Sequence, residues 1–181
     1  GIQFYAGGII GDMANSVSVR QSVNRGSVEA EFCAGGLVGR MSGSNGAVTS
    51  NYNTGDVLAN SYAGGLIGVM TGASGGSQVA CCYNIGDVNL NISGKCIGAL
   101  FGAMLDGTYT NLTALKNPAN ASLPLVGLLN GSASTGEYLE ADKMKTESFL
   151  NALLASGNHF IKDYMNAQDG FPILKWELNL E

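Results

Sequence analysis

The chain alternates between short apolar runs and stretches of glycine, asparagine and serine over most of its length. In one stretch, apolar and β-prone residues gather at 36–41, 47–53 and 56–62. The segments between them read Ser-Gly-Ser-Asn-Gly at 42–46 and Asn-Thr-Gly at 53–55, which are turn sequences. Short apolar runs bounded by turn residues are typical of strands, so the pattern predicts three short strands joined by corners.

This pattern recurs as an internal repeat. A motif of Ala-Gly-Gly, two aliphatic residues and Gly occupies residues 6–11, 34–39 and 63–68, and weaker copies follow at 97–102 and 122–127. The copies are about 29 residues apart, and a fixed period of this size indicates a repeat architecture.

A second motif recurs in phase with the first. It reads Ser-Val-Asn-Arg-Gly-Ser-Val at 22–28, Asn-Tyr-Asn-Thr-Gly-Asp-Val at 51–57 and Cys-Tyr-Asn-Ile-Gly-Asp-Val at 82–88. Two motifs recurring together argue strongly against coincidence, and each repeat is therefore expected to be one structural unit.

A repeat of short strands predicts a mainly β fold: a parallel β-solenoid, or single-stranded β-helix, with right-handed winding favoured. Helical repeats would need long segments with a period of 3.6 residues, which the repeat region lacks, and the Leu/Asn framework of leucine-rich repeats is also absent. Each repeat would form one coil, and coils would stack about 4.8 Å apart. Five coils are expected, with a height of roughly 20 Å.

Equivalent residues of the repeats should stack in columns along the solenoid. The Gly-Gly pair before each aliphatic position permits close approach of the backbone where a Cβ would clash. Stacked asparagine side chains can hydrogen-bond from coil to coil and are expected to be structural. Val23, Tyr52, Tyr83 and Leu112 are expected to form a further buried column. The aliphatic ladder is Ile9, Leu37, Leu66, Leu100 and Leu125, and the asparagine ladder is Asn24, Asn53 and Asn84.

The end of the chain departs from the repeat. Solenoid repeats are expected over 1–131, and a cap of helix and strand over 132–181. An apolar face at 137–156 predicts a helix, and 171–176 predicts a final strand. Because a solenoid end exposes unpaired strands and core, this segment is expected to close the stack.

Composition narrows the functional classes. Charged residues are 13% of the 181 residues, about half the usual share, while 45% are apolar, which argues against intrinsic disorder. The net charge of −5 disfavours nucleic-acid binding, which relies on Lys and Arg at phosphates. Residues 57–86 carry no charge, but polar residues interrupt them throughout, so no membrane span is expected.

The four cysteines do not predict a metal site. No C-x-x-C motif is present and His159 is the only histidine, so zinc is not expected. Cys33 and Cys96 share a column two coils apart, about 10 Å, which exceeds disulfide reach. Small buried thiols are the favoured interpretation, and a disulfide such as Cys81 to Cys33 stays open as an alternative.

The repeats offer few groups for catalysis. Asp56 and Asp87 should be neighbours on adjacent coils and are the best candidate pair for a cation, although a solvated corner is the favoured interpretation. Motifs of serine hydrolases, zinc proteases and phosphate loops are absent from the sequence. The chain is therefore expected not to be an enzyme and to hold no cofactor. Glu29 and Glu31 share one face of a strand, and Arg20 and Arg25 are expected one strand away. Surface ion pairs explain this group as well as a site does.

The paired motifs at 34–39 and 51–57 resemble the GLUG repeat of bacterial surface and secreted proteins. Residues 144–150 and 166–176 resemble the segment that often closes such arrays. The resemblance covers nearly the whole chain, and it implies an extracellular or cell-surface location and an adhesin-like role. The fourth and fifth copies depart from the motif, since Gly-Gly is replaced there by Gly-Ala and Leu-Pro.

The resulting expectation is a noncatalytic module for adhesion, binding or display, whose partner is a host glycan or protein. Two alternatives stay open: a carbohydrate-active or carbohydrate-binding β-helix, and a passive spacer. Residues 4–8 match 61–65, so the chain begins within a repeat. The rest of a longer parent polypeptide is therefore expected upstream of Gly1, together with an exposed apolar edge on the first coil.

Overall fold

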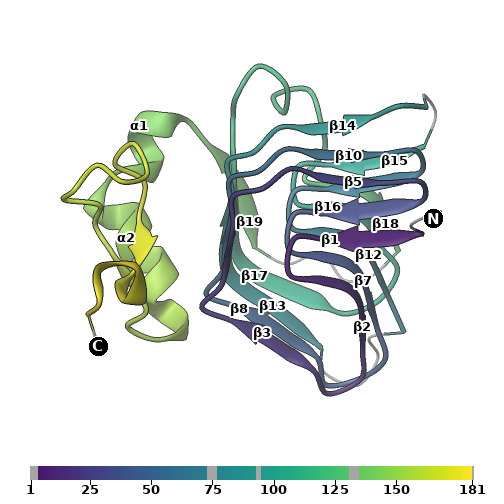
Figure 1. The fold of residues 1–181 in the computed structure, drawn as a ribbon, viewed down its shortest axis with the longest axis horizontal. Helices are drawn as coiled ribbons and strands as arrows, with labels where there is room; N and C mark the ends of the chain where they lie inside the picture. The colour runs from purple at the N-terminus through teal and green to yellow at the C-terminus, as the bar shows by residue number, and fades with distance from the viewer. Residues whose placement is uncertain (1–3, 73–76, 93–94, 131–134, 181) are drawn as a thin grey trace.

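The computed structural model describes residues 4–72, 77–92, 95–130 and 135–180, which form a parallel β-solenoid with a small lobe beside it (Figure 1). The predicted fold class is confirmed: the structure is mainly β, and its parallel sheets wind into a solenoid. The solenoid has about four turns where the repeat count predicts five, and the helices are short.

Four parallel sheets, named A to D here, form the faces of the solenoid. Sheet A contains β1 (Tyr5–Gly7), β6 (Cys33–Gly35), β11 (Tyr62–Gly64) and β15 (Cys96–Gly98). Sheet B contains β2 (Ile10–Ala14), β7 (Val38–Ser42), β12 (Ile67–Thr71), β16 (Phe101–Met104) and β18 (Val126–Leu129). Sheet C contains β3 (Ser18–Arg20), β8 (Ala47–Thr49), β13 (Gln78–Asn84), β17 (Thr108–Leu115) and β19 (Gly136–Leu139), with β4 (Val23–Asn24) and β9 (Tyr52–Asn53). Sheet D contains β5 (Val28–Ala30), β10 (Val57–Ala59) and β14 (Val88–Leu90).

The central residues of the aliphatic ladder are buried in the core, whereas its first residue is exposed. Leu37, Leu66 and Leu100 have no exposed surface, and each connects to the next coil through backbone hydrogen bonds. Leu125 is half-buried. Ile9 is 40% exposed, because on the first described coil it has a neighbouring coil on one side only. The expectation of a buried Ile9 is therefore wrong, whereas the exposed apolar edge expected on this coil is observed.

The Gly-Gly motif allows sheets A and B to pack against each other through backbone atoms. A Cβ added to Gly35 would lie 2.0 Å from the carbonyl oxygen of Val38 and 2.5 Å from the amide nitrogen of Gly68. Both neighbours are backbone atoms, one of the same coil and one of the next coil, so neither can move aside. The glycine of each repeat is thus required by close packing between sheets.

The asparagine column forms a continuous buried ladder of hydrogen bonds. Asn24 Nδ2 donates to Asn53 Oδ1 and Asn53 Nδ2 donates to Asn84 Oδ1, both at 2.8 Å. Each amide also donates to the carbonyl two residues on, at Gly26, Gly55 or Gly86. The ladder therefore links neighbouring coils and satisfies the buried corner of each coil at the same time.

A repeated kink in sheet C reverses the alternation of inward and outward side chains, so that the residue after the kink faces the core. Cys82 consequently faces inward, while Tyr52 and Tyr83 pack against the C-terminal lobe. The expected column is confirmed for Val23, Tyr52 and Tyr83, and both tyrosines are buried, although beneath the lobe. The expected fourth member is wrong, because Thr113 and not Leu112 pairs with Tyr83. The kink residues all have positive φ, between 48° and 56°: Gln21, Ser50, Cys81 and Asn111.

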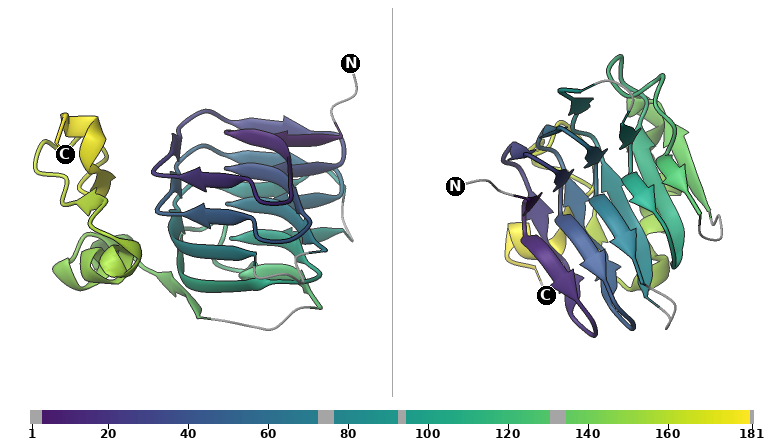
Figure 2. Two further views of the ribbon diagram at one scale, coloured as in Figure 1. Left: turned by 90° about the horizontal axis from the view of Figure 1, so that it is seen from below. Right: turned by 90° about the vertical axis from the view of Figure 1, so that its right-hand side faces the viewer.

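The C-terminal lobe, residues 141–180, lies against the outer side of sheet C (Figures 1 and 2). Its packing contacts come from Val23, Tyr52, Tyr83, Leu115 and Leu139, which together span the solenoid from its first coil to its last strand. Its elements are α1 (Ala141–Met144), α2 (Glu147–Leu153), β20 (Phe160–Ile161), β21 (Ile173–Leu174) and the 3₁₀ helices Leu154–Ser156 and Lys175–Leu178.

The lobe covers a side of the stack and not its end, so the expected closing role is wrong. Leu128 and Leu129 on the last strand of sheet B are 37% and 40% exposed. The segment predicted as one helix over 137–156 instead begins with β19, which pairs with β17 and extends sheet C. Segment 171–176 holds the short strand β21, which pairs antiparallel with β20. The lobe therefore begins after β19, within the segment expected to be the cap.

Removing one asparagine from the ladder should destabilise the solenoid. In Asn53→Ala, the Gly55 carbonyl and the Asn24 and Asn84 amides each lose a buried hydrogen bond, which should lower the free energy of unfolding by about 2 to 4 kcal/mol. Urea denaturation measures this loss. The matched control is Asn60→Ala, which removes an amide that bonds between coils at an exposed corner outside the asparagine ladder. It should lower the free energy of unfolding by less than about 1 kcal/mol. Equal losses in the two variants would contradict the role of burial.

Candidate binding groove between the solenoid and the C-terminal lobe

The lobe is held by two tyrosines stacked on adjacent coils. The rings of Tyr52 and Tyr83 lie 4.8 Å apart and within 5° of parallel, because in-register strands repeat at the rung spacing. Both residues have no exposed surface. Phe149 of α2 meets the Tyr83 ring edge-on at 5.8 Å, and Phe160 of β20 contacts both tyrosines. The apolar side of the lobe is therefore fixed to a rigid part of sheet C.

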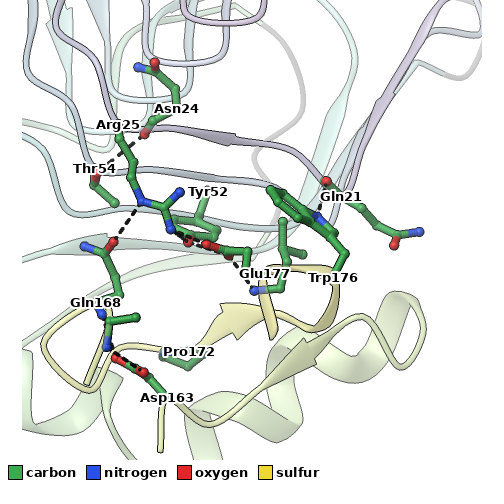
Figure 3. Close-up of polar contacts among 12 residues, drawn as sticks. Gln21, Asn24, Arg25, Tyr52, Thr54, Asp163, Gln168, Pro172, Trp176 and Glu177 are labelled. Atoms are coloured by element: carbon green, nitrogen blue, oxygen red, sulfur yellow. Dashed lines mark hydrogen bonds and ion pairs between the residues drawn. The ribbon is translucent and has the colours of Figure 1, made fainter. Parts of the chain in front are cut away.

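Polar bonds surround this aromatic contact (Figure 3). Tyr52 Oη donates to Glu177 Oε1 at 2.7 Å, and Arg25 forms an ion pair with the same carboxylate. Arg25 also donates to Tyr52 Oη at 2.9 Å, while Tyr83 Oη donates to the Pro172 carbonyl. The surface ion pair expected for Arg25 is thus replaced by a bond between the solenoid and the lobe.

Burial changes the acidity of both phenols. Burial raises the pKa of Tyr83 well above its ordinary value of 10.0, and nearby Tyr52 and Glu177 add to the rise. The pKa of Tyr52 is also raised, first by burial and then by its hydrogen bond to Glu177. Both phenols stay protonated at neutral pH and act there as hydrogen-bond donors.

A loop of the lobe is ordered by Asp163. Its carboxylate accepts backbone hydrogen bonds from Ala167, Gln168 and Gly170 at 2.7 to 3.1 Å. Partial burial would raise the pKa of this carboxyl, but the backbone donors outweigh that effect and the net pKa is lowered. Gln168 in turn accepts a 3.4 Å hydrogen bond from Arg25, so this loop also connects to the solenoid.

A groove runs between sheet C and the helical part of the lobe. It consists of three adjoining cavities of about 360, 310 and 240 Å³. The first two share Asn111, and the first and third share Glu137, Phe149 and Ala152. One wall is the outward face of strands from several coils, and the other is α2 with the 3₁₀ turn after it. We call this feature the sheet C groove.

The sheet C groove combines neutral hydrogen-bonding groups with an apolar wall. Phe149 and Leu153 of α2 provide the apolar part of the central cavity. Arg20 lies at one end, while Glu137 and Lys143 lie at the other. Such lining suits an extended, largely uncharged ligand. The neutral polar lining residues are Thr49, Gln78, Thr110, Asn111, Thr113, Thr135, Thr146, Ser148 and Ser156.

The acidic pair expected at the solenoid corner lies elsewhere, away from this groove. Asp56 Oδ1 accepts a 3.1 Å bond from the Asp87 amide, and Asp87 Oδ1 accepts a 2.6 Å bond from Asn117 Nδ2. The two residues are thus neighbours on adjacent coils, where they continue the hydrogen bonding of the corner. In the described part of the chain, no group of three or more His, Cys, Asp and Glu side chains could hold a metal ion.

All four cysteines are free thiols, so the disulfide left open by the sequence is not formed. Cys33 and Cys96 flank Tyr62 in sheet A, two coils apart as expected. Burial raises the pKa of Cys33 and that of Cys82 to about 12. Cys81 lies in the wall of the sheet C groove, where its thiol contacts the Ala152 carbonyl.

Comparisons with known proteins support the fold. No family model matches the chain, and no curated protein matches it. One solved structure is similar: the crystal structure of a protein from Bacteroides ovatus named a "putative immunoglobulin A1 protease", with a TM-score of 0.70 and 20% identity. The similarity covers 97% of this chain and 54% of the other, so this chain corresponds to about half of that protein.

This likeness corrects the expectation that the chain is not an enzyme. The similar structure carries the name of a protease, so a noncatalytic assignment made from missing motifs does not stand. At 20% identity the likeness establishes the fold alone. No helix in the described residues is long and apolar enough to cross a membrane.

The stability of the protein should fall as the pH rises above about 10, and the two buried phenols should cause much of the fall. Both have a raised pKa in the folded state, so their contribution is fully present below the unfolded value of 10.0. It is lost progressively as the pH rises from there toward the folded-state values, because the unfolded chain releases the protons first.

Substituting both phenols tests this dependence. In the double variant Tyr52→Phe with Tyr83→Phe, the free energy of unfolding should fall less between about pH 9 and pH 11 than in the wild type. Urea denaturation across this range gives both slopes. Tyr164→Phe, at a residue 71% exposed on the lobe, is the control and should follow the wild type. An unchanged slope in the double variant would refute the assignment.

Proposed function

We propose that the chain is the ligand-binding β-solenoid part of a secreted or cell-surface polypeptide, and that the sheet C groove binds an extended segment of a host protein. The observation that carries the proposal is the row of three adjoining cavities between the strands and the lobe. Grooves that combine an apolar wall with convergent polar groups are the usual form of a binding site.

The lining favours an extended polypeptide segment. Its threonine, asparagine and glutamine side chains supply donors and acceptors that match backbone amides. The exposed Ala152, on the same helical wall as the buried Phe149 and Leu153, offers apolar contact to side chains on one side of the bound segment. The single cation Arg20 at one end and the mixed charges of Glu137 and Lys143 at the other make the two ends different, which favours one direction of binding.

The similar solved structure adds a specific ligand to test. Its name includes immunoglobulin A1, and this chain corresponds to about half of its length. We infer that the parent polypeptide acts on a host glycoprotein, and that the solenoid presents or retains the substrate. The GLUG resemblance supports the same surface location and an adhesive or display role for the array.

Binding to immunoglobulin A1 tests the proposal. Ala152 is exposed on α2 and lines two of the cavities, so Ala152→Trp should fill the groove and weaken binding at least about tenfold, or 1.4 kcal/mol. Surface plasmon resonance with immobilised immunoglobulin A1 measures the change. The matched control is Asn151→Trp, an exposed neighbour on the same helix outside the described lining, and it should bind as the wild type does.

Two results would contradict the proposal: no binding by the wild type, or equal loss of binding in the two tryptophan variants. Electrophoresis of the same mixtures reports cleavage of the immunoglobulin heavy chain. Cleavage by the purified chain would assign proteolysis to these residues, and the groove variant would then show whether the cut segment lies in the groove.

A further inference from the structure

A second surface lies at the corner between sheets D and A, on the side of the solenoid away from the lobe (Figure 1). The chain turns there at Glu31-Phe32 on one coil and at Asn60-Ser61 on the next. Three aromatic rings follow this corner along the solenoid axis. Phe32 meets Tyr5 edge-on at 6.2 Å and Tyr62 edge-on at 5.4 Å.

The Tyr5 and Tyr62 rings pack on a buried apolar base, and the exposed Phe32 ring packs between them. Cys33 and Ala103 have no exposed surface and pack beneath Tyr5 and Tyr62. Phe32 itself is 39% exposed. An aromatic ring held in place by buried neighbours loses little conformational freedom on binding, which favours its use as a contact surface.

A row of polar side chains runs beside the rings. Asn60 Nδ2 donates to Glu31 Oε2 at 2.8 Å, and Asn91 Nδ2 donates to Asn60 Oδ1 at 3.0 Å. Each bond uses one hydrogen of an amide group that has two, and each amide and carboxylate oxygen can accept more than one bond. Glu31 and Asn91 are exposed, so the row can offer further donors and acceptors to a ligand.

The ion pair of Arg40 and Asp12 lies at one end of this surface. The Arg40 guanidinium lies 4.5 Å from the centre of the Tyr5 ring and is paired with Asp12. Because Asp12 balances its charge, Arg40 does not make the surface a site for anions. The surface as a whole is therefore aromatic and hydrogen-bonding, with the charge of Glu31 at its edge.

We propose that this corner, formed by Phe32, Tyr62 and the row Glu31, Asn60 and Asn91, is a binding site for a neutral oligosaccharide. A pyranose ring presents apolar C–H groups on its faces and hydroxyl groups around its edge. The aromatic rings match the face, and the adjacent amides and carboxylate match the hydroxyl groups. The sugar chain would lie along the solenoid axis, where both rows are continuous from coil to coil.

The polar row is the reason to favour a sugar over an apolar protein partner. An apolar surface laid on Phe32 and Tyr62 would also cover Glu31 and Asn60 and remove water from the donors and acceptors that their mutual hydrogen bond does not use, which is costly. Hydroxyl groups along the edge of a sugar would replace the water at these side chains. This site is separate from the sheet C groove and does not depend on the proposed binding of a host protein.

A panel of immobilised neutral hexose and N-acetylhexosamine oligosaccharides tests the site. The wild-type chain should bind at least one of them, and Phe32→Ala and Asn60→Ala should each weaken that binding about tenfold or more, measured by calorimetry with the same sugar. Tyr164→Ala is the matched control, because it removes a more exposed ring on the lobe and should leave binding unchanged. Circular dichroism of each variant verifies the fold.

Three outcomes would overturn the inference. The first is no binding to any sugar of the panel, and the second is binding that folded Phe32→Ala and Asn60→Ala variants retain at wild-type strength. The third is loss of sugar binding in the groove variant Ala152→Trp and not in Phe32→Ala, which would place the sugar in the groove. Loss of immunoglobulin binding alone in Ala152→Trp would leave the sugar site standing and test only the proposed function.

Discussion

The close packing of sheets A and B through glycine is the constraint on which the rest of the structure depends. At Gly35 a Cβ would meet backbone atoms of its own coil and of the next coil at 2.5 Å or less. The bend therefore forms only when each coil that contributes a strand to sheet A places a glycine in this column. That requirement fixes the register of the stack, and the register brings Asn24, Asn53 and Asn84 into one hydrogen-bonded ladder.

The same register produces both candidate sites. Because the coils are aligned, Tyr52 stacks on Tyr83 and gives the lobe an apolar anchor, while Arg25 and Glu177 join its edge to the solenoid. Anchoring at these points leaves a groove between sheet C and α2. On the other side of the solenoid, the alignment places Phe32 beside rings of neighbouring coils. In a solenoid of this kind, one position of the repeat recurs on every coil, so its side chains together form an extended surface.

The sequence predicts the solenoid and its columns because the repeat marks equivalent positions directly. It does not reveal that the tyrosine column faces the lobe, because Ser50 and Cys81 adopt positive φ and reverse the inward and outward alternation of the strand although neither is glycine. The lobe is expected at the end of the stack, because a solenoid end exposes unpaired strands, but it lies on the side of the stack. Glu177 of the lobe forms an ion pair with Arg25, which lies 152 residues earlier in the chain, and no local sequence pattern predicts such a pairing.

The most direct test of this account compares two alanine substitutions of repeat glycines by equilibrium unfolding. A Cβ at Gly64 would lie 2.0 Å from the Ile67 carbonyl oxygen and 2.6 Å from the Gly102 nitrogen, whereas at Gly26 the nearest described atom is the Asn24 side-chain oxygen at 3.7 Å. Gly64→Ala should abolish folding or lower the free energy of unfolding by about 3 kcal/mol or more, and Gly26→Ala should change it by less than about 1 kcal/mol. Similar stabilities for the two variants would contradict the claim that backbone packing at glycine sets the register.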